Sequence, residues 1–151
     1  MSEIEAYIAQ LDSIRGEAVE TVRGMSVEEL GWTPLAADTS SPTVLVTHMA
    51  GSEGFWIHQV AGGIDVRRDR DSEFAARPTS SADLVAALER AGKTSRGVLR
   101  GLSRTDLDGK RPSRPGQDPV TIRYAILHQI DHMAQHLGHL ALTHQLFMAR
   151  A

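Results

Sequence analysis

The chain has 151 residues, contains no cysteine and carries a formal net charge of -3 at pH 7. The length suits a single domain, residues 1–151, with one hydrophobic core. The lack of cysteine excludes disulfides, thiolate metal ligands and a cysteine nucleophile, so any thiol chemistry needs a small-molecule thiol. Charges of both signs are interspersed, which argues against a basic face for nucleic acid.

The first ten residues lack the basic start and apolar run of a signal peptide, and no later stretch is apolar enough to cross a membrane. We therefore expect a soluble, cytoplasmic protein. The arginines Arg67, Arg68 and Arg70 alternate with aspartates, a pattern that predicts a solvated loop.

Apolar residues recur at three- and four-residue steps in four segments, as expected for amphipathic helices. The segments are residues 2–25, about 43–61, about 81–102 and 120–148. A capping box formed by Ser26 and Glu29 predicts a short helical turn after the first segment. The expected fold is all-α: a four-helix bundle with long loops between the second and third and between the third and fourth helices.

Histidines are concentrated in the last helical segment. The chain has seven in total, and five lie at His128, His132, His136, His139 and His144. At about 100° per residue, the first four share a stripe that borders the apolar face. His132 and His136 lie one turn apart, so both rings can point toward one spot, as in a metal-chelating His-x-x-x-His pair. Taken alone, such a pair is more often a surface feature or a partly satisfied core feature than a metal site.

His48 lies on the apolar side of the second helical segment. A buried imidazole needs partners for two ring nitrogens, and one interpretation is a hydrogen bond to a backbone carbonyl or to Glu53. The other interpretation is that His48, His132 and His136 hold one divalent metal ion, which satisfies three inward imidazoles together. Three protein ligands leave a coordination position open for water or a thiol, as in a reactive site.

The remaining histidines are weaker candidates. His58 and His144 fall on the far sides of their helices, and we expect both to be solvated. His128 and His139 share the stripe, and each is interpreted as a hydrogen-bond partner of a ligand, a proton shuttle or a surface residue. No catalytic residue is assigned, because Glu53 and His128 are only guesses for a general base.

Three short motifs resemble those of the DinB-like superfamily. Residues 128–140 resemble its last-helix signature, a histidine pair one turn apart followed by a glycine-containing step. Residues 46–56 resemble its second-helix motif, a histidine followed by a small residue, an acidic residue and aromatics, and residues 26–32 also fit. The chain departs from the pattern at His139, where many members have Gln or Glu.

The resemblance implies that His48, His132 and His136 are the metal ligands, with zinc or nickel as the ion. It also implies a homodimer, and an enzyme that acts on a small molecule with a low-molecular-weight thiol such as mycothiol or bacillithiol, as a transferase or isomerase. Activation of water by the metal is a related hypothesis.

Two non-enzymatic hypotheses stay open. One is a metal-binding or stress-related homodimer without turnover, and the other is an interaction bundle that binds no metal. A ferritin-like di-iron site is disfavoured, because that architecture needs Glu-x-x-His motifs, and the nearest approach, Glu53 to Trp56, lacks the histidine.

Overall fold

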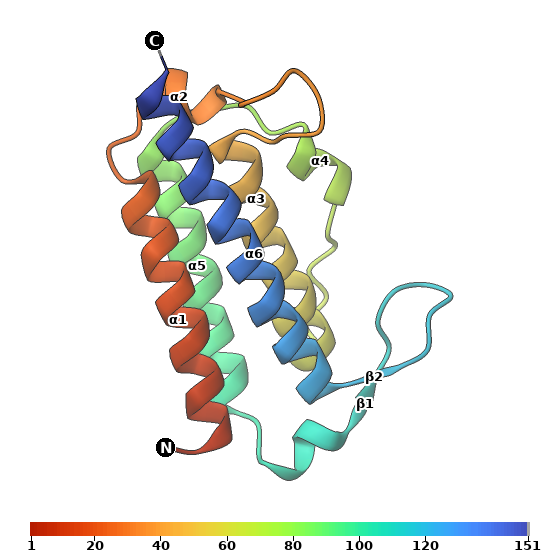
Figure 1. The fold of residues 1–151 in the computed structure, drawn as a ribbon. Coiled ribbons are helices and arrows are strands. Elements are labelled where there is room, and N and C mark those ends of the chain that lie inside the picture. Colours follow the sequence, from red (N-terminus) through yellow and green to blue (C-terminus); the bar gives the residue numbers. More distant parts are fainter. Residues whose placement is uncertain (151) are drawn as a thin grey trace.

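Four long helical segments pack side by side in the computed structural model, which describes residues 1–150 (Figure 1). They are α1 (Glu3–Val22), α3 (Pro42–Glu53) with its π-helical continuation η1 (Gly54–Ala61), α5 (Ser81–Arg100) and α6 (Ile122–Ala149). Helix α1 packs against α5 and α6, and α3 also contacts both of these helices. The predicted all-α four-helix bundle is confirmed.

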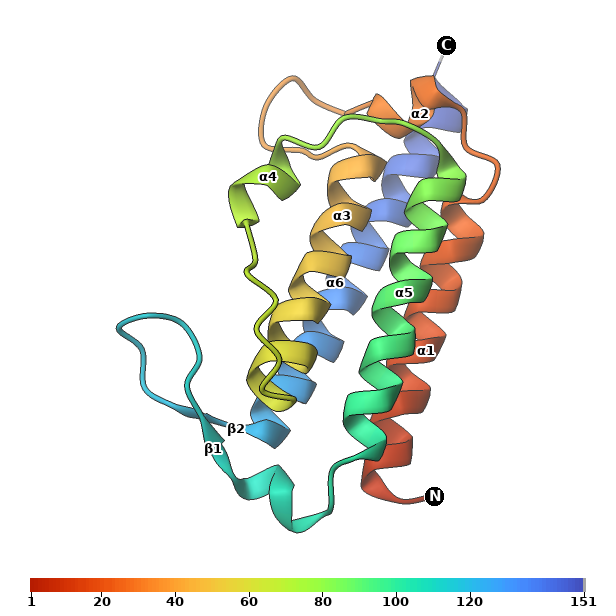
Figure 2. The ribbon, with the colours of Figure 1, turned by 180° about the vertical axis from the view of Figure 1, so that it is seen from behind.

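Short elements occupy the connections, as the view from behind also shows (Figure 2). They are α2 (Val27–Gly31), α4 (Arg70–Phe74), the 3-10 helix η2 (Thr105–Asp108), β1 (Lys110–Arg111) and β2 (Val120–Thr121). The two strands pair antiparallel and hold the base of the loop that precedes α6. Helix α2 is the turn predicted after the first helix, whereas α4 lies in a connection that the sequence predicted to be an irregular loop.

Hydroxyl side chains fix where the long helices begin. Ser2, Ser41, Ser80 and Thr121 each accept a hydrogen bond from the backbone N–H three residues further on. These bonds satisfy N–H groups that have no partner within the helix. Pro42, at the first position of α3, has no N–H to satisfy there and carries a φ angle suited to a helix.

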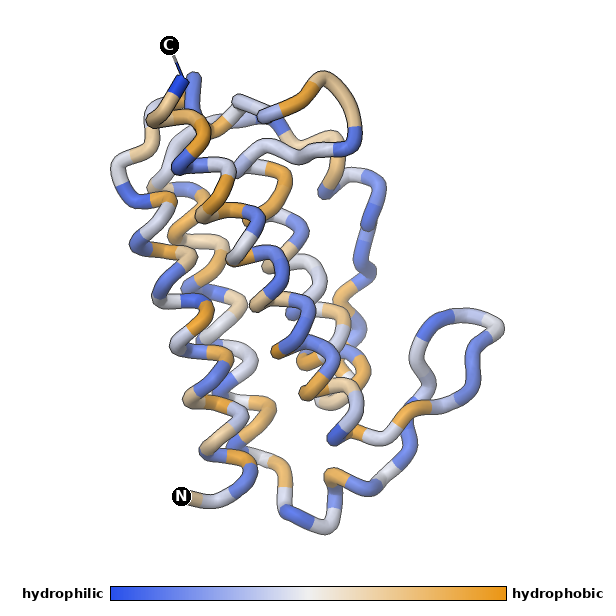
Figure 3. Tube along the Cα trace, in the orientation of Figure 1, coloured by the Kyte–Doolittle hydropathy of each residue, from blue (hydrophilic) through white to orange (hydrophobic). Residues whose placement is uncertain are grey.

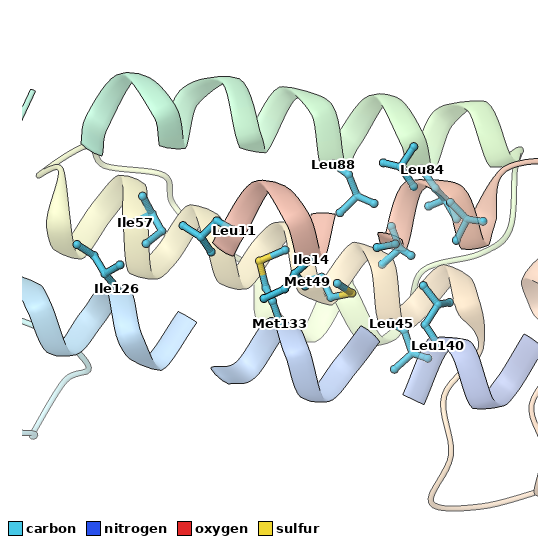
Figure 4. Close-up of a cluster of buried hydrophobic side chains, with 14 of the residues drawn as sticks. Leu11, Ile14, Leu45, Met49, Ile57, Leu84, Leu88, Ile126, Met133 and Leu140 are labelled. Carbon is cyan, nitrogen blue, oxygen red and sulfur yellow. The ribbon is translucent and has the colours of Figure 1, made fainter. Parts of the chain in front are cut away.

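Apolar side chains from all four long helices meet along the bundle axis (Figure 4). Leu11, Met49, Leu88 and Met133 come from α1, α3, α5 and α6, and each is at most 1% exposed. Each long helix carries both apolar and polar residues along its length, as the hydropathy colouring shows (Figure 3). Among residues 1–150, no helix combines the length and apolar character needed to span a bilayer.

The π-helix η1 changes which side chains face the bundle. In η1 each backbone N–H bonds to the carbonyl group five residues earlier, instead of four as in an α-helix. A helical wheel drawn at α-helical spacing therefore no longer gives the direction of the side chains after Gly54. His58 is consequently buried, and its Nε2 donates to the carbonyl oxygen of Ala91 at 3.2 Å and lies 3.0 Å from Oγ of Ser95. The prediction that His58 is solvated was therefore wrong.

Candidate metal centre

Three imidazoles converge between α3 and α6. Nε2 of His132 lies 3.1 Å from Nε2 of His48 and 3.1 Å from Nε2 of His136. One ring nitrogen of each of the three residues lies within 4.8 Å of the others. His132 and His136 share a face because they are one helical turn apart, and His48 reaches them because α3 packs against α6. The structure thus brings together the three residues that the sequence selected.

The spacing of these nitrogens fits a shared ion. Two nitrogens bound to one tetrahedral zinc lie about 3.3 Å apart, given Zn–N bonds of about 2.0–2.1 Å. Without an ion, each close pair of neutral rings has to share a proton, and His132 takes part in both pairs. Three imidazole nitrogens are also a donor set that suits zinc and nickel. The residues present therefore fit a divalent transition metal.

Glu73 fixes the orientation of the His48 ring. Its Oε2 lies 2.7 Å from Nδ1 of His48, and both side chains are buried. Because a carboxylate accepts, Nδ1 of His48 carries the donated proton, and Nε2 of the neutral ring keeps its lone pair toward His132. Phe74, the next residue of α4, packs against the same ring with centroids 4.8 Å apart.

Glu73 is itself held by Arg68 and accommodated by Gly51. Nε of Arg68 donates to Oε1 of Glu73 at 2.6 Å, and Nη2 donates to Oε2 at 2.8 Å. A Cβ atom at position 51 of α3 would lie 2.1 Å from Oε1 of Glu73, so only glycine leaves space for the carboxylate. The prediction of a solvated arginine loop was therefore wrong for Arg68, whose side chain is 13% exposed.

The surroundings keep the three rings neutral. Burial lowers the pKa of His132 to about 3, with added repulsion from His136 and His48. Burial and the neighbouring His48 and His139 lower the pKa of His136 to about 4. Burial also lowers the pKa of His48, although Glu73 opposes this shift. Neutral imidazoles are the form that binds a metal ion, so no proton has to be displaced near pH 7.

Two buried ring nitrogens lack a partner. Within residues 1–150, Nδ1 of His132 and Nδ1 of His136 have no hydrogen-bond acceptor, in contrast to Nδ1 of His48. His128, one turn before His132, stacks on Tyr124 and contacts the ring of Trp56 at 4.5 Å between centroids. These contacts give His128 an aromatic setting, and its pKa is lowered, mainly by burial.

Glu53 does not reach the histidine cluster. It is fully buried, pairs with Arg15 of α1 and accepts a hydrogen bond from Oγ of Ser95 at 2.6 Å. The guess that Glu53 is a general base therefore fails, as does the interpretation that it is the partner of His48. Likewise, His144 is not simply solvated, because its Nδ1 lies 2.5 Å from Oε1 of Glu29.

Sequence reasoning missed Glu73 and Arg68. A local signal was present: Asp69 caps α4 by accepting from the backbone N–H of Ser72, a pattern that marks a helix start. That signal predicts the short helix but not its docking, because Glu73 lies 25 residues after His48 in the chain. The small size of Gly51 was the only hint on α3 that another group packs there.

Comparison with known proteins places this architecture in a class. The helical bundle has the fold of DinB-like proteins. A family model described as mycothiol-S-transferase matches residues 7–147, so the chain belongs to the mycothiol-S-transferase family. No curated protein matches the chain.

Solved structures share the fold at low sequence identity. A conserved protein from Enterococcus faecalis matches with a TM-score of 0.79 and 18% identity, covering 99% of both chains. A DinB-like protein from Bacillus subtilis matches with a TM-score of 0.73 and 19% identity, covering 97% of this chain and 93% of that one. A mycothiol-dependent maleylpyruvate isomerase matches with a TM-score of 0.68 and 13% identity, covering 92% and 61%. The present chain thus corresponds to about three fifths of the isomerase.

Proposed function

We propose that this protein is a metal-dependent enzyme of the thiol S-transferase or isomerase type, in which His48, His132 and His136 hold one divalent ion. The observation that carries the proposal is the convergence of three Nε2 atoms, two pairs of which lie 3.1 Å apart. Family membership and the fold of a mycothiol-dependent isomerase support thiol chemistry over other metal-assisted reactions.

A zinc or nickel ion bound by these three imidazoles would lower the pKa of a thiol or water beside it and so would supply a nucleophile near neutral pH. The residues of the chain bind the ion and orient its histidine ligands. Glu73 keeps the proton of His48 on Nδ1, Arg68 holds Glu73 in place, and Phe74 covers one side of the His48 ring. No general base is assigned.

The thiol comes from a small molecule, since the chain contains no cysteine. In a transfer, the thiol proton goes to solvent, the sulfur forms a bond to an electrophilic carbon, and the leaving group departs with the electron pair of the broken bond. In an isomerisation, the thiol adds to the substrate and is later eliminated unchanged. We propose mycothiol as the thiol, with bacillithiol as the alternative, and a cytoplasmic homodimer as the acting form.

Elemental analysis of protein purified without a histidine tag tests the metal site. Wild type is expected to carry one transition-metal ion per chain, and His48→Ala, His132→Ala and His136→Ala are each expected to lose it. His144→Ala is the matched control, because it removes a histidine from the same helix α6 outside the cluster. Retention of the ion by all three cluster variants would reject the site.

Cobalt substitution tests the thiol. Addition of mycothiol to the Co²⁺-loaded protein is expected to produce a sulfur-to-cobalt charge-transfer band in the near ultraviolet, because a thiolate that enters the open position bonds directly to the ion. Bound cobalt without such a band, for mycothiol and bacillithiol alike, would reject the thiol hypothesis and favour metal-activated water or metal binding without turnover.

A further inference from the structure

A cavity of about 750 Å³ lies between α6 and the segment that joins α2 to α3. The residues of its wall include Leu35, Asp38, His136, His139, Leu142 and Leu146. Drug-sized ligands bind in protein cavities of roughly 300–1,000 Å³. The cavity therefore has room for a small organic molecule.

The cavity adjoins the histidine cluster. His136 belongs both to the cluster and to the cavity wall, and the ring of His139 lies 5.6 Å from the ring of His136. Leu45 and Thr143, which are buried, also line the wall, so this is a hollow and not a flat apolar face. A molecule in the cavity lies beside the ring that faces His132.

The wall selects for an apolar, uncharged ligand. Leu35, Leu142 and Leu146 are 64%, 54% and 43% exposed, so an apolar ligand would cover leucine surface that otherwise faces water. Among residues 1–150, no lysine or arginine lines the cavity, and its one carboxylate is Asp38. An anionic ligand would thus find no cationic partner there, apart from a protonated histidine.

Basic side chains lie elsewhere around the cluster. Arg70 is placed over the ring of Phe74 and Arg114 over the ring of Trp56, with distances of 4.8 and 5.4 Å to the ring centroids. Neither arginine lines the cavity. These arginines therefore supply no positive charge to the wall of the cavity.

We propose that this cavity binds the electrophilic cosubstrate, and that this cosubstrate is an uncharged small molecule with an apolar body. The role as electrophile rests on the proposed function, whereas binding of an uncharged apolar molecule rests only on the cavity. A ligand seated there places its reacting carbon toward His136 while Leu35, Leu142 and Leu146 cover its body.

The test uses the neutral fluorophore N-phenyl-1-naphthylamine, titrated into metal-free protein. Saturable binding is expected for wild type, and Leu142→Asp and Leu35→Asp are each expected to raise the dissociation constant at least tenfold. Leu127→Asp is the matched control, because Leu127 is 48% exposed on the same helix α6 but does not line the cavity. Circular dichroism checks that each variant is folded, and Leu35→Asp changes only an exposed loop residue.

Four results would overturn the proposal. They are no saturable binding to wild type, equal binding to wild type and both cavity variants, an equal loss in Leu127→Asp, and tighter binding of the anionic analogue 8-anilinonaphthalene-1-sulfonate. Sedimentation distinguishes the competing occupant: a dimer that binds no probe and dissociates in Leu142→Asp would assign this face to a second copy of the chain.

The two proposals fail separately, because probe binding needs neither metal nor thiol. Loss of probe binding in the cavity variants, together with elemental analysis that finds no metal in wild type as purified, would leave the cavity assigned and reject the proposed function. One ion per chain in wild type, with unchanged probe binding in the cavity variants, would reject the cavity proposal and leave the proposed function standing.

Discussion

Nδ1 of His48 donates a hydrogen bond of 2.7 Å to Oε2 of Glu73, which joins α3 to the short helix α4. The contact determines which nitrogen of His48 is free to bind an ion, because the proton on Nδ1 leaves the lone pair on Nε2. Arg68 holds the carboxylate through two hydrogen bonds. The connection between α3 and α5 therefore contributes to the candidate centre as well as linking two helices.

Replacing Glu73 is expected to weaken metal binding without removing a ligand. In Glu73→Gln the charged acceptor for His48 is lost, and changes of this kind cost about 10- to 100-fold in metal affinity. Competition with a chromogenic zinc chelator measures the affinity. Asp71→Asn is the control, since Asp71 is exposed on the same helix, and its affinity should equal that of wild type. Equal affinities in wild type and Glu73→Gln would show that the contact does not support the site.

Adding one methyl group to α3 is expected to have the same effect. The Cβ atom in Gly51→Ala would clash with Oε1 of Glu73 at 2.1 Å, so the carboxylate has to move away from His48. Gly138→Ala on α6 is the control, because its Cβ would meet nothing within 4 Å. In a helix interior alanine is more stable than glycine by about 0.5–1 kcal/mol, so only the control should gain stability.

Urea denaturation and the zinc affinity assay check this pair of variants. The control should keep its zinc affinity while its free energy of unfolding rises, and Gly51→Ala should lose affinity. A gain in stability at both positions with unchanged zinc binding would contradict the packing of Glu73 against α3.

Local signals made the bundle and the convergence of the three histidines predictable. The Ser26 cap of α2 and the periodic apolar residues act within a few positions of the chain, and His132 and His136 lie on one helical face for the same reason. Packing of α3 against α6 then follows from burying their apolar faces, which brings His48 to the pair.

The remaining features depend on contacts that have no local signature. Glu73 reaches His48 only after an intervening polar stretch folds back onto α3, and its charges resemble those of a solvated loop. His58 is buried because η1 departs from α-helical spacing, which a wheel at 100° per residue does not describe. Both errors came from assuming regular geometry or full solvation where tertiary contacts decide.

Breaking the buried ion pair on the opposite side of α3 should unfold the protein more readily and leave the metal bound. Arg15 pairs with Glu53, which is 0% exposed, and removing one partner of a buried pair costs about 3–5 kcal/mol. Arg15→Met is therefore expected to lower the free energy of unfolding by that amount in urea denaturation. Arg23→Met, which removes an exposed pair with Glu20, should change it by less than about 1 kcal/mol.

Measuring the metal content of the variants distinguishes a structural role of Arg15 from a role in the candidate metal centre. Both variants should retain one ion per chain at temperatures where they are folded, because neither arginine contacts the histidine cluster. If folded Arg15→Met lost the ion, the separation between the buried pair and the candidate centre would be wrong.

The stability of the metal-free protein is expected to fall as the pH decreases from about 6.5 toward 4. The pKa of His132 is lowered from 6.5 to about 3 in the folded chain, so below pH 6.5 the unfolded chain binds a proton that the folded chain does not. Stability therefore rises with pH across this window and falls on acidification. His136, with a pKa lowered to about 4, acts in the same direction.

Urea denaturation at a series of pH values with a chelator present measures the effect, and His132→Gln isolates it from the other titrating groups. The variant keeps a polar side chain that does not titrate, so its stability should fall less steeply between pH 6.5 and 4. Identical slopes for the two proteins would mean that His132 takes up a proton in the folded chain as readily as in the unfolded one, and that burial beside His48 and His136 does not hold its ring neutral.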